Sequence, residues 1–505
     1  MNIASSLVRA AERWPDRIAL RDLDAPAAQR NITYSDVSRM SCAIASGLLS
    51  SGLKPGDRVA LLMNNSWEYV VTFFGIAAAG LVAVPLNTRL LEGEHWHMLH
   101  DSQAKALVIE SALLADRRKL SGMRGLQQFV TRGSIRSFYE LLAAPPMNVV
   151  QSAPEELFSL MYTSGTTGLP KAVMLPHRAW IKTSDYVKKF LNYDSDDVTL
   201  HSAALTHGAG FLVLPTFEAG GCNLICAKFN AARVLKIMRD ENVSNGFFVP
   251  SMIQMLLNEP PSPPIPSLKF LYYAGSAIGQ PTLFGAMERF GPVLLQSFGQ
   301  MEAPMFLTVL DSADHQNLAN GVVSRLAHSA GRAAPGVEVR IVGDRDEDVM
   351  SGEMGEIVVR APQMMLGYWN RADATAETMR GGWLYTGDIG RIDADDYLYV
   401  LDRKKDMIIS GGANVYAREV EELLLKIDGI KEVAVFGLPD SKWGESVTAA
   451  IVSDGDKPSE ASLIAFCKEH LPDYRRPKRY IWLNELPRNA YGKVLKRELR
   501  QRFSS

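Results

Sequence analysis

The chain has 505 residues, of which 47% are hydrophobic and 22% charged, and its formal net charge is −2 at pH 7. This length exceeds what a single hydrophobic core serves, so we expect a folded protein with more than one domain. The nearly balanced charge gives no electrostatic reason to expect a nucleic-acid partner.

The cysteines and the N-terminus bear on the compartment. Four scattered cysteines are too few for a disulfide framework, which favours a reducing environment. Charges are spread through the first twenty residues, so no apolar core of a secretory signal is visible. We therefore predict a cytoplasmic protein. The cysteines are Cys42, Cys222, Cys226 and Cys467, and no second cysteine or histidine pair with zinc spacing accompanies the middle two.

Helix-like and strand-like segments alternate through the first two-thirds of the chain. Such alternation predicts an α/β fold, in which parallel or mixed sheets are covered by helices on both faces. Ligand loops in sheets of this kind follow the carboxyl ends of strands. The predicted helices span 35–49 and 66–79, and the predicted strands span 57–63, 81–86, 106–110 and 155–162.

One segment, 69–86, is uncharged over a length close to a membrane span. Gly75, Gly80 and Pro85 interrupt it. We therefore expect a buried helix to Ala79, a stop at the glycine and a short strand, in preference to a membrane helix.

Three histidines, His95, His97 and His100, lie close together in the sequence. On a helix, His97 and His100 share a face but His95 does not join them. We expect solvated helix residues here, and a metal cluster is the alternative.

The pattern of helix-like and strand-like segments changes near residues 401–405. The final hundred residues contain short strands such as 432–438 and 449–452, one or two helices and a basic end. We therefore predict a large N-terminal domain, 1–401, followed by a small α+β domain, 406–505.

The segment 161–177, "MYTSGTTGLPKAVMLPH", follows the predicted strand at 155–162. It is not a Walker phosphate loop, because Pro170 precedes Lys171 and Ala172 follows it. Its small hydroxyl residues, glycines and lysine nevertheless form a plausible nest for phosphate oxygens. Considered alone, the loop is also consistent with a flexible surface segment, which glycine-rich loops usually are.

Four further motifs follow this loop in order, and together the five resemble the signatures of the adenylate-forming superfamily. They are "QSFGQMEAP" at 296–304, "YTGDIG" at 385–390, "DRKKDMIISGG" at 402–412 and "PRNAYGK" at 487–493. The resemblance runs from about residue 11 to residue 503 and is closest to the aryl- and fatty-acid–CoA ligases.

The resemblance implies an ATP site with magnesium. Phe298 offers adenine a flat apolar face, and Glu302, the only charged residue of its stretch, suits Mg²⁺. Asp388, in a tight turn after Gly387, accepts hydrogen bonds from the ribose hydroxyls, and Arg403 reinforces it. The remaining implied ATP-binding residues are Thr163, Ser164, Gly165, Thr166, Thr167, Gly168, Lys171, Gly275, Ser276 and Gly299.

The resemblance also implies a two-step reaction. A carboxylate attacks the α-phosphorus of ATP, pyrophosphate leaves, and Lys493 stabilises the charge that develops. The small, mobile domain then turns about a hinge at 402–405, centred on Lys405, and a thiol displaces AMP from the acyl adenylate. The residues implied for coenzyme A are Gly411, Gly412, Trp443, Tyr474 and Arg476.

Two positions depart from the family pattern. Met301 stands where a threonine usually touches the α-phosphate, so one hydroxyl donor is missing. Ala172 replaces a common glycine, which is a milder change.

The segments expected to wall the acyl pocket contain, apart from Glu302, no ionisable residue except His207. A pocket without a fixed cation or carboxylate suits neither dicarboxylates nor amino acids, and it favours aromatic or medium-to-long aliphatic acids. His207 aligns with a gating residue of the family and counts among the implied catalytic residues, with Lys493 and Glu302. The predicted pocket residues are His207, Phe248, Gly299 and Met305.

We therefore expect an enzyme, an AMP-forming acid–thiol ligase that uses ATP, Mg²⁺ and coenzyme A and possesses no integral membrane segment. A homodimer is compatible with the sequence. Loading of a carrier-protein phosphopantetheine, oxygenation of the adenylate, and non-catalytic binding of acyl or nucleotide ligands are the alternatives.

Overall fold

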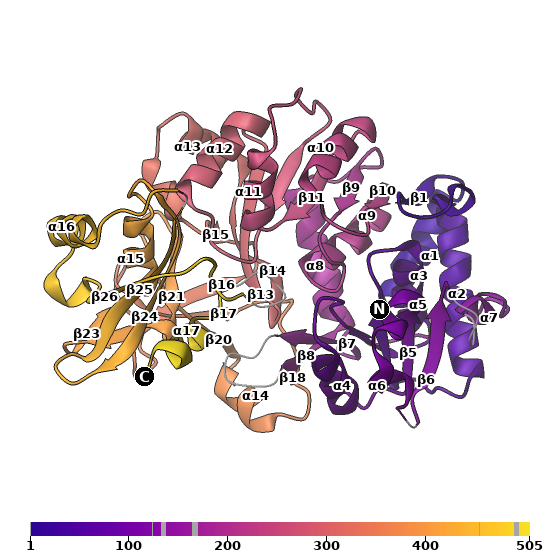
Figure 1. Cartoon of the computed structure of the whole chain (residues 1–505). Coiled ribbons are helices and arrows are strands. Elements are labelled where there is room, and N and C mark those ends of the chain that lie inside the picture. The colour runs from indigo at the N-terminus through magenta and orange to yellow at the C-terminus, as the bar shows by residue number, and fades with distance from the viewer. Residues whose placement is uncertain are drawn as a thin grey trace. The chain divides into compact units, whose positions relative to one another are not determined.

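The computed structural model describes residues 2–123, 125–132, 138–163, 170–453, 455–488 and 494–504. The chain divides into two compact units (Figure 1). The first comprises residues 1–338 and 360–384, and the second comprises residues 339–359 and 385–505.

Two twisted sheets organise the first unit. In the described residues the larger has nine strands in the order β15-β14-β13-β12-β11-β9-β10-β1-β2, and the smaller has seven in the order β18-β8-β7-β4-β3-β5-β6. The inner strands run parallel, while antiparallel strands lie toward the edges. The larger sheet comprises β1 (Ile18–Asp22), β2 (Asn31–Thr33), β9 (Val198–His201), β10 (Cys222–Ile225), β11 (Asn245–Phe248), β12 (Phe270–Tyr273), β13 (Leu294–Gln300), β14 (Ala303–Leu310) and β15 (Arg332–Ala333). The smaller sheet comprises β3 (Arg58–Leu62), β4 (Val82–Pro85), β5 (Ala106–Glu110), β6 (Gln127–Thr131), β7 (Leu157–Thr163), β8 (Lys171–Pro176) and β18 (Gly367–Tyr368).

Helices connect these strands and cover the sheets, which confirms the predicted α/β class. Helices α3 and α8 each contact strands of both sheets, so they form a layer between them. The helices of this unit are α1 (Ile3–Arg13), α2 (Tyr34–Ser50), α3 (Trp67–Ala78), α4 (Glu92–Asp101), α5 (Ser111–Ala115), α6 (Arg118–Ser121), α7 (Phe138–Leu142), α8 (His177–Phe190), α9 (Val213–Ala219), α10 (Ala231–Asp240), α11 (Pro250–Asn258), α12 (Gln280–Phe290), α13 (Ser312–Ala319) and α14 (Ala372–Thr378). Short 3₁₀ turns η1 (Ala27–Gln29), η2 (Gly208–Leu212) and η3 (Ser324–His328), with the short strand β19 (Met379–Arg380), complete it.

The uncharged segment 69–86 is part of this core. Every residue of α3 is buried, as expected for a helix that is apolar all round. The chain turns at Gly80, where φ is +68°, and continues as the buried strand β4. The prediction of a helix, a glycine stop and a strand is confirmed. Among the described residues, no helix combines the length and the apolar character needed to cross a membrane.

The histidine prediction at α4 is wrong for one residue. His95 is fully buried, and its Nε2 lies 2.8 Å from the carbonyl oxygen of Asn87. Arg117 Nε donates to His95 Nδ1 at 3.2 Å. His95 faces inward because α4 presents it with Met98 and Leu99 to the core. His100 is exposed, as predicted.

The second unit contains two smaller sheets. The first has the order β16-β17-β20-β19, with β21 beside β20. It comprises β16 (Glu338–Val342), β17 (Gly355–Arg360), β20 (Trp383–Ile392) and β21 (Leu398–Arg403), and it also includes β19, which belongs to the first unit as some ends of the other strands do. The second has the order β23-β22-β25-β24, with β26 beside β25. Its elements are η4 (Lys404–Asp406), β22 (Ile408–Ser410), β23 (Ala413–Val415), α15 (Ala417–Leu424), β24 (Ile430–Asp440), β25 (Gly444–Ser453), α16 (Glu460–His470), η5 (Asp473–Arg475), β26 (Arg479–Trp482) and α17 (Lys496–Phe503).

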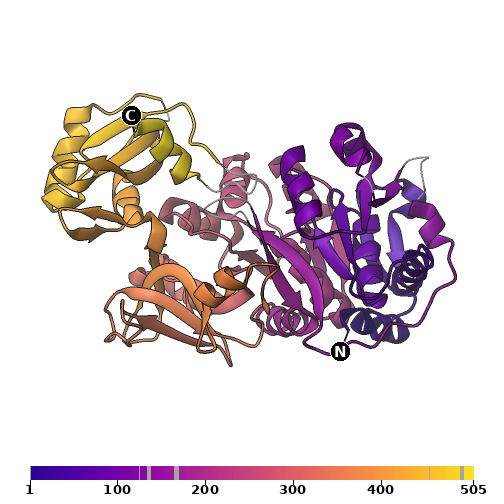
Figure 2. The ribbon, with the colours of Figure 1, turned by 90° about the horizontal axis from the view of Figure 1, so that it is seen from below.

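Alternation along β24 and β25 gives this last sheet two apolar faces. Val435 and Ile451 pack with α15 and α16 on one face. Phe436 and Ala450 pack with Leu499 of α17 on the other. Figure 2 shows helices of this C-terminal segment, drawn in yellow, lying against its sheet. The C-terminal segment is therefore an α+β layer structure with helices on both faces.

Candidate active site

A hairpin holds the two ends of the predicted phosphate loop. Thr163, the last residue of β7, pairs with Lys171, the first residue of β8. The Thr163 hydroxyl donates to the Lys171 carbonyl at 3.4 Å. The loop between them thus follows the carboxyl end of a strand, as predicted. Ser164, Gly165, Thr166, Thr167 and Gly168 lie outside the described residues.

A second hairpin, β13–β14, carries Phe298, Gly299 and Glu302. Its register shifts between Phe298 and Gln300, so the strand bulges at the predicted adenine-binding aromatic. A Cβ on Gly299 would lie 2.2 Å from the carbonyl oxygen of Met305. Met305 itself has a φ of +68°, which is unusual for a residue with a side chain. Only glycine fits at 299, and the two predicted pocket residues Gly299 and Met305 are neighbours.

Glu302 lies in the two-residue turn of this hairpin. Its Oε1 accepts a hydrogen bond of 2.7 Å from the hydroxyl of Tyr368 in β18. The Lys171 ammonium lies 5.3 Å from the centre of the Tyr368 ring. The structure therefore brings the predicted magnesium ligand and the predicted phosphate-binding lysine to the same tyrosine. The sequence analysis missed Tyr368, because no local pattern links residue 368 to residues 171 and 302.

Gly275 and Ser276 follow β12 after a single residue, Ala274, and β12 is a neighbour of β13 in the parallel part of the sheet. Gly275 has a φ of +90°, a left-handed conformation that favours glycine. Both residues are exposed. This position at the carboxyl end of a central strand agrees with the nucleotide-binding role that the resemblance implies.

His207 precedes the 3₁₀ turn η2, in the connection that follows β9. Burial lowers its pKa to about 4, so the imidazole is neutral at pH 7. The next residue, Gly208, is packed against the ring of Phe247, to which an added Cβ would approach within 2.6 Å. Phe247 in turn makes an edge contact with Tyr272, with ring centres 5.4 Å apart.

Phe248, the predicted pocket residue on β11, has its side chain elsewhere. It is fully buried in the core that α10 and α11 share with the sheet. Successive side chains of a strand point to opposite faces, so Phe247 lies on the His207 side. The sequence carries no signal that distinguishes the two faces of this strand, and only Phe248 was predicted.

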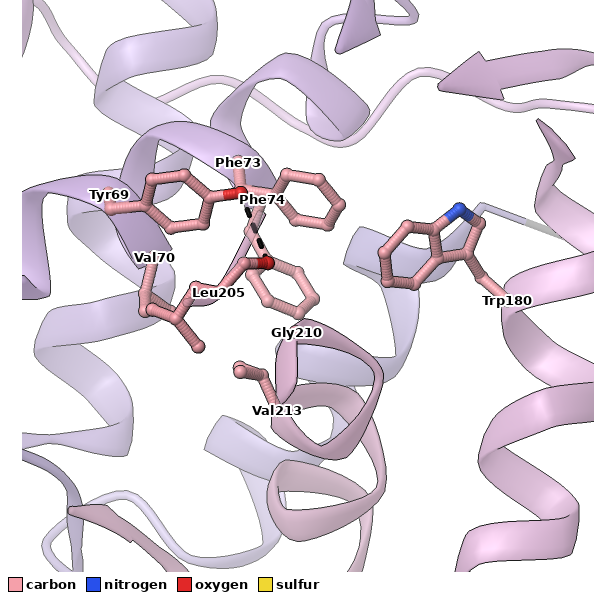
Figure 3. A pocket seen from close by; sticks show the side chains of 8 residues that line it. All are labelled: Tyr69, Val70, Phe73, Phe74, Trp180, Leu205, Gly210 and Val213. Carbon is pink, nitrogen blue, oxygen red and sulfur yellow. Dashed lines mark hydrogen bonds between the residues drawn. The ribbon is translucent and has the colours of Figure 1, made fainter. Parts of the chain in front are cut away.

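A small apolar cavity lies behind the His207 loop (Figure 3). It has a volume of about 10 Å³, room for one water at most. Tyr69 crosses one side of it and donates a 3.4 Å hydrogen bond to the Leu205 carbonyl. The other residues lining it are Val70, Phe73, Phe74, Trp180, Gly210 and Val213. It is a void between α3, α8 and the loop, too small to hold an acyl group.

In the second unit, Asp388 and Arg403 lie directly opposite each other on β20 and β21. Arg403 Nε contacts Asp388 Oδ1 at 2.7 Å, and Asp388 is 3% exposed. Contrary to the prediction of a tight turn, Asp388 belongs to a strand, because Gly387 bends the backbone without ending the strand. Glu356, which the sequence analysis missed, supports this region by accepting from the Gly387 N–H at 3.2 Å.

The predicted hinge residue Lys405 lies in the short 3₁₀ turn η4, which joins β21 to β22. Gly411 and Gly412 form the two-residue turn between β22 and β23, with φ of +60° and +78°. Both left-handed values are those of a type I′ hairpin turn. The turn packs against Trp443, and the Gly411 N–H donates to the Trp443 carbonyl at 2.8 Å.

Two ammonium groups flank the predicted coenzyme A surface. Lys478 Nζ lies 4.6 Å and Lys442 Nζ 5.2 Å from the Trp443 ring. Arg476 instead donates to the Leu471 carbonyl at 2.7 Å, which ties it to the end of α16. Tyr474 lies beside Arg475, which bonds to its hydroxyl. The residues implied for coenzyme A include Arg476 but not Lys478.

Lys493 lies outside the described residues, but its flanking residues are placed. Arg488 and Val494 form an antiparallel bridge, and the Leu495 N–H donates to the Pro487 carbonyl at 2.8 Å. Lys496 Nζ pairs with Glu421 Oε1 at 2.8 Å. The chain segments on the two sides of residues 489–493 are therefore paired with each other.

The donor set around Glu302 fits a magnesium ion shared with nucleotide phosphates. Mg²⁺ prefers hard oxygen ligands and is usually held by one or two carboxylates together with substrate phosphates. Glu302 supplies one carboxylate, of which Oε1 is engaged by Tyr368. Within the described ranges, no group of three or more His, Cys, Asp or Glu side chains could hold an ion without such help.

Comparison with known proteins agrees with this arrangement. Residues 7–369 match the model of the AMP-binding enzyme family, and residues 419–493 match that of the AMP-binding enzyme C-terminal domain. A feruloyl-CoA synthase of Amycolatopsis sp. is 36% identical over 498 residues, covering 97% of this chain and 98% of the relative. The long-chain fatty-acid–CoA ligase FadD13 of Mycobacterium tuberculosis is 34% identical over 486 residues, covering 95% of each chain.

A solved structure shows the same likeness over nearly the whole chain. The o-succinylbenzoate CoA synthetase MenE of Bacillus subtilis, in complex with its acyl-adenylate intermediate, superposes with a TM-score of 0.87 at 29% identity. The match covers 98% of this chain and 97% of that one.

Proposed function

This chain belongs to the AMP-binding enzyme family and is an acid–thiol ligase of the AMP-forming kind, and we propose that it joins an aromatic or medium-to-long aliphatic acid to coenzyme A. One observation carries the proposal. Glu302 and Lys171, predicted from two separate motifs to contact magnesium and phosphate, meet at Tyr368 in the folded chain.

In the first step, a carboxylate oxygen of the acid attacks the α-phosphorus of ATP and pyrophosphate leaves. Charge develops on the phosphoryl oxygens, so positioning and cationic donors lower the barrier. Lys171, the first residue of β8, and Lys493 of the C-terminal motif supply these donors. A magnesium ion, when bound at Glu302, neutralises part of the phosphate charge.

In the second step, a thiol attacks the acyl carbonyl and AMP leaves. The type I′ turn at Gly411 and Gly412 presents backbone without side chains, which suits close approach by a narrow pantetheine chain. Trp443, flanked by Lys442 and Lys478, offers a ring and positive charge to the nucleotide end.

The surroundings of His207 support an apolar acid. His207 is neutral at pH 7. The next residue, Gly208, packs against Phe247, whose ring contacts Tyr272. A neutral, aromatic wall favours an apolar body over a second carboxylate. The two reported relatives are named for an aromatic acid and for long-chain fatty acids, so both classes belong in the test.

The test is acid-dependent release of pyrophosphate. Benzoates, cinnamates and fatty acids are assayed with and without coenzyme A, on wild type, Lys493→Ala and Arg497→Ala. Arg497 is an exposed cation on α17 and controls for the loss of one positive charge near the loop. We expect release that needs an acid and Lys493, with a loss of about 10²-fold or more in Lys493→Ala.

A CoA thioester as the product identifies the ligase and its acid class. If the adenylate forms but coenzyme A saturates the enzyme weakly or not at all, the acceptor is a carrier-protein phosphopantetheine and not coenzyme A. Tight nucleotide binding without release for any acid would support the non-catalytic alternative. Cytoplasmic location and a homodimer stay predictions of the sequence.

A further inference from the structure

Tyr368 lies at the junction of the two sheets of the first unit. Its strand, β18, pairs with β8 of the smaller sheet, with Tyr368 opposite Val173. Its hydroxyl reaches Glu302 in the β13–β14 turn of the larger sheet. One side chain thus joins two hairpins that lie in different sheets.

The backbone around Tyr368 is fixed at several points. The Met365 N–H donates to the Glu302 carbonyl at 2.8 Å, and the Trp369 N–H donates to the Ala172 carbonyl at 2.9 Å. The Tyr368 N–H donates to Thr375 Oγ1 at 2.9 Å. The segment 365–369 is therefore a clip with one end bonded to the Glu302 turn and the other to the strand that begins with Lys171.

The side chain is positioned as firmly as the backbone. Tyr368 is only 8% exposed, and its hydroxyl bond to Glu302 is short at 2.7 Å. Hydrogen bonds from a neutral donor to a carboxylate are among the stronger ones in proteins. Because Oε1 of Glu302 is held by Tyr368, the rotation of the carboxylate is restricted and the direction of Oε2 is set.

The ring of Tyr368 has a second neighbour. The Lys171 ammonium lies 5.3 Å from the ring centre, within the range of cation–π attraction. The hydroxyl and the ring therefore act on different groups, the hydroxyl on a carboxylate and the ring on a cation. These two actions can be separated by substitution.

We propose that Tyr368 is a positioning residue for the magnesium–triphosphate site: its hydroxyl orients the Glu302 carboxylate toward the metal, and its ring holds the Lys171 ammonium toward the phosphates. The inference rests on the proposed function and adds a residue that none of the five sequence motifs contains. Partners that orient metal ligands change metal affinity by about 10- to 100-fold when they are removed.

The experiment measures binding in the absence of any acid, so turnover is not the readout. Titration calorimetry gives the Kd of ATP with excess Mg²⁺ and the Kd of ATP in EDTA, for wild type, Tyr368→Phe and Tyr368→Leu. Tyr399→Phe is the matched control, because Tyr399 donates a similar bond of 2.9 Å to Asp393 outside the predicted site. Thermal unfolding of each variant checks that it is folded.

We expect Tyr368→Phe to weaken the binding of ATP with Mg²⁺ about tenfold and to change the binding of ATP in EDTA less than about threefold. The phenyl ring keeps the contact with Lys171, so only the metal-dependent part is lost. Tyr368→Leu removes the ring as well and should weaken both forms. Tyr399→Phe should bind both forms as wild type does.

Equal Kd changes for both forms in Tyr368→Phe, or no change in either, would overturn the positioning role of the hydroxyl. If wild type binds ATP more tightly with Mg²⁺ than in EDTA, the proposed function stands in that case. A wild-type protein that binds ATP equally with and without Mg²⁺ would overturn the metal site itself, and with it both proposals.

Discussion

Gly299 shows how little room the β13–β14 hairpin leaves at a single residue. An added Cβ would lie 2.2 Å from the Met305 carbonyl oxygen and 2.7 Å from the carbonyl carbon. Both atoms belong to the backbone, so no rotamer change relieves the contact. We expect Gly299→Ala to lower the free energy of unfolding by about 1–3 kcal/mol and to weaken ATP binding, because the hairpin carries Phe298 and Glu302. Denaturant titration and nucleotide calorimetry measure the two effects.

Gly93→Ala is the matched control for this substitution. Gly93 lies in α4 with open space around it, and alanine is a better helix former by up to about 1 kcal/mol. The control should therefore be neutral or slightly stabilising. A Gly299→Ala variant as stable as wild type would contradict the packing argument.

At the level of single residues, the sequence predicted which side chains pair better than it predicted which side chains are buried and where they point. Asp388 and Arg403 were paired correctly because two separate motifs supplied them. The burial of His95 and the orientation of Phe248 were missed, since both depend on which face of an element the core covers. Tyr368 was missed for a different reason: its partners come from distant parts of the chain.

Among the elements, α17 is the one that follows the predicted catalytic lysine. Lys496, the first residue of α17, pairs with Glu421 of α15. Burial of the ammonium lowers the pKa of Lys496, but nearby carboxylates, Glu421 above all, outweigh this effect, and the pKa is raised. Glu421 also accepts from the Val435 N–H at 2.8 Å, so the pair ties the helix to the sheet. Lys493 lies three residues before Lys496 in the sequence, so we expect Lys496→Met to slow pyrophosphate release about tenfold or more, while the Kd of ATP changes little.

Lys496→Arg provides the comparison, because it keeps the charge that Glu421 needs. It should recover part of the rate that Lys496→Met loses. Removal of one partner from a buried pair costs about 3–5 kcal/mol in the least favourable case, so the unfolding of both variants is measured beside their rates. Unchanged pyrophosphate release in a folded Lys496→Met would refute the anchoring role.

Elements with strong periodicity were predicted well. The helices at 35–49 and 66–79 and the four early strands are present with boundaries that shift by only a few residues. The clip at 365–369 was not predicted, because β18 has only two residues and its pairing with β8 is set by tertiary contacts. Strands this short carry no readable period.

For the molecule as a whole, contacts across the predicted hinge are the feature to test. Asp402 Oδ2 accepts from the Ala417 N–H at 2.6 Å, and Arg418 Nη1 donates to the Val400 carbonyl at 3.0 Å. These bonds join residues before Lys405 to residues after it, so a large rotation there must break them. We expect Asp402→Ala to change the rates of adenylate formation and thioester formation in opposite directions, by several-fold each. Rapid-quench measurement of the separate steps provides the check.

If Asp402→Ala slows adenylate formation and thioester formation to the same extent, Asp402 serves only to stabilise α15. Its carboxylate lies at the N-terminus of that helix, where it satisfies an N–H group and interacts favourably with the helix dipole. The free energy of unfolding of Asp402→Ala separates these contributions. A variant with unchanged stability and unchanged rates would show that the hydrogen bond of Asp402 to Ala417 does not affect the rotation.

Buried neutral histidines make stability depend on pH. Desolvation by burial is the main cause that lowers the pKa of each of them to about 4, from an ordinary value near 6.5. Between these values the unfolded chain binds protons that the folded chain does not, so the free energy of unfolding falls as the pH falls from about 6.5 to about 4. Above about pH 7 these groups contribute no pH dependence. The residues are His95, His177, His201 and His207.

Urea titrations at about pH 5 and about pH 7 give the comparison, because most carboxyl groups are still ionised in that range. We expect a clearly lower free energy of unfolding at the lower pH, with an unchanged dependence on urea concentration. Equal free energies of unfolding at the two pH values would show that the folded chain binds protons at these imidazoles as readily as the unfolded chain does.

The contact that the clip at 365–369 makes between the two hairpins forms late in the synthesis of the chain. Lys171 and Glu302 leave the ribosome before Tyr368, which completes the contact between them. At about 5–20 residues per second, the emerging chain spends roughly ten to forty seconds with Lys171 made and its tyrosine not yet made. A nascent chain that ends before residue 365 therefore lacks the contact between the two hairpins.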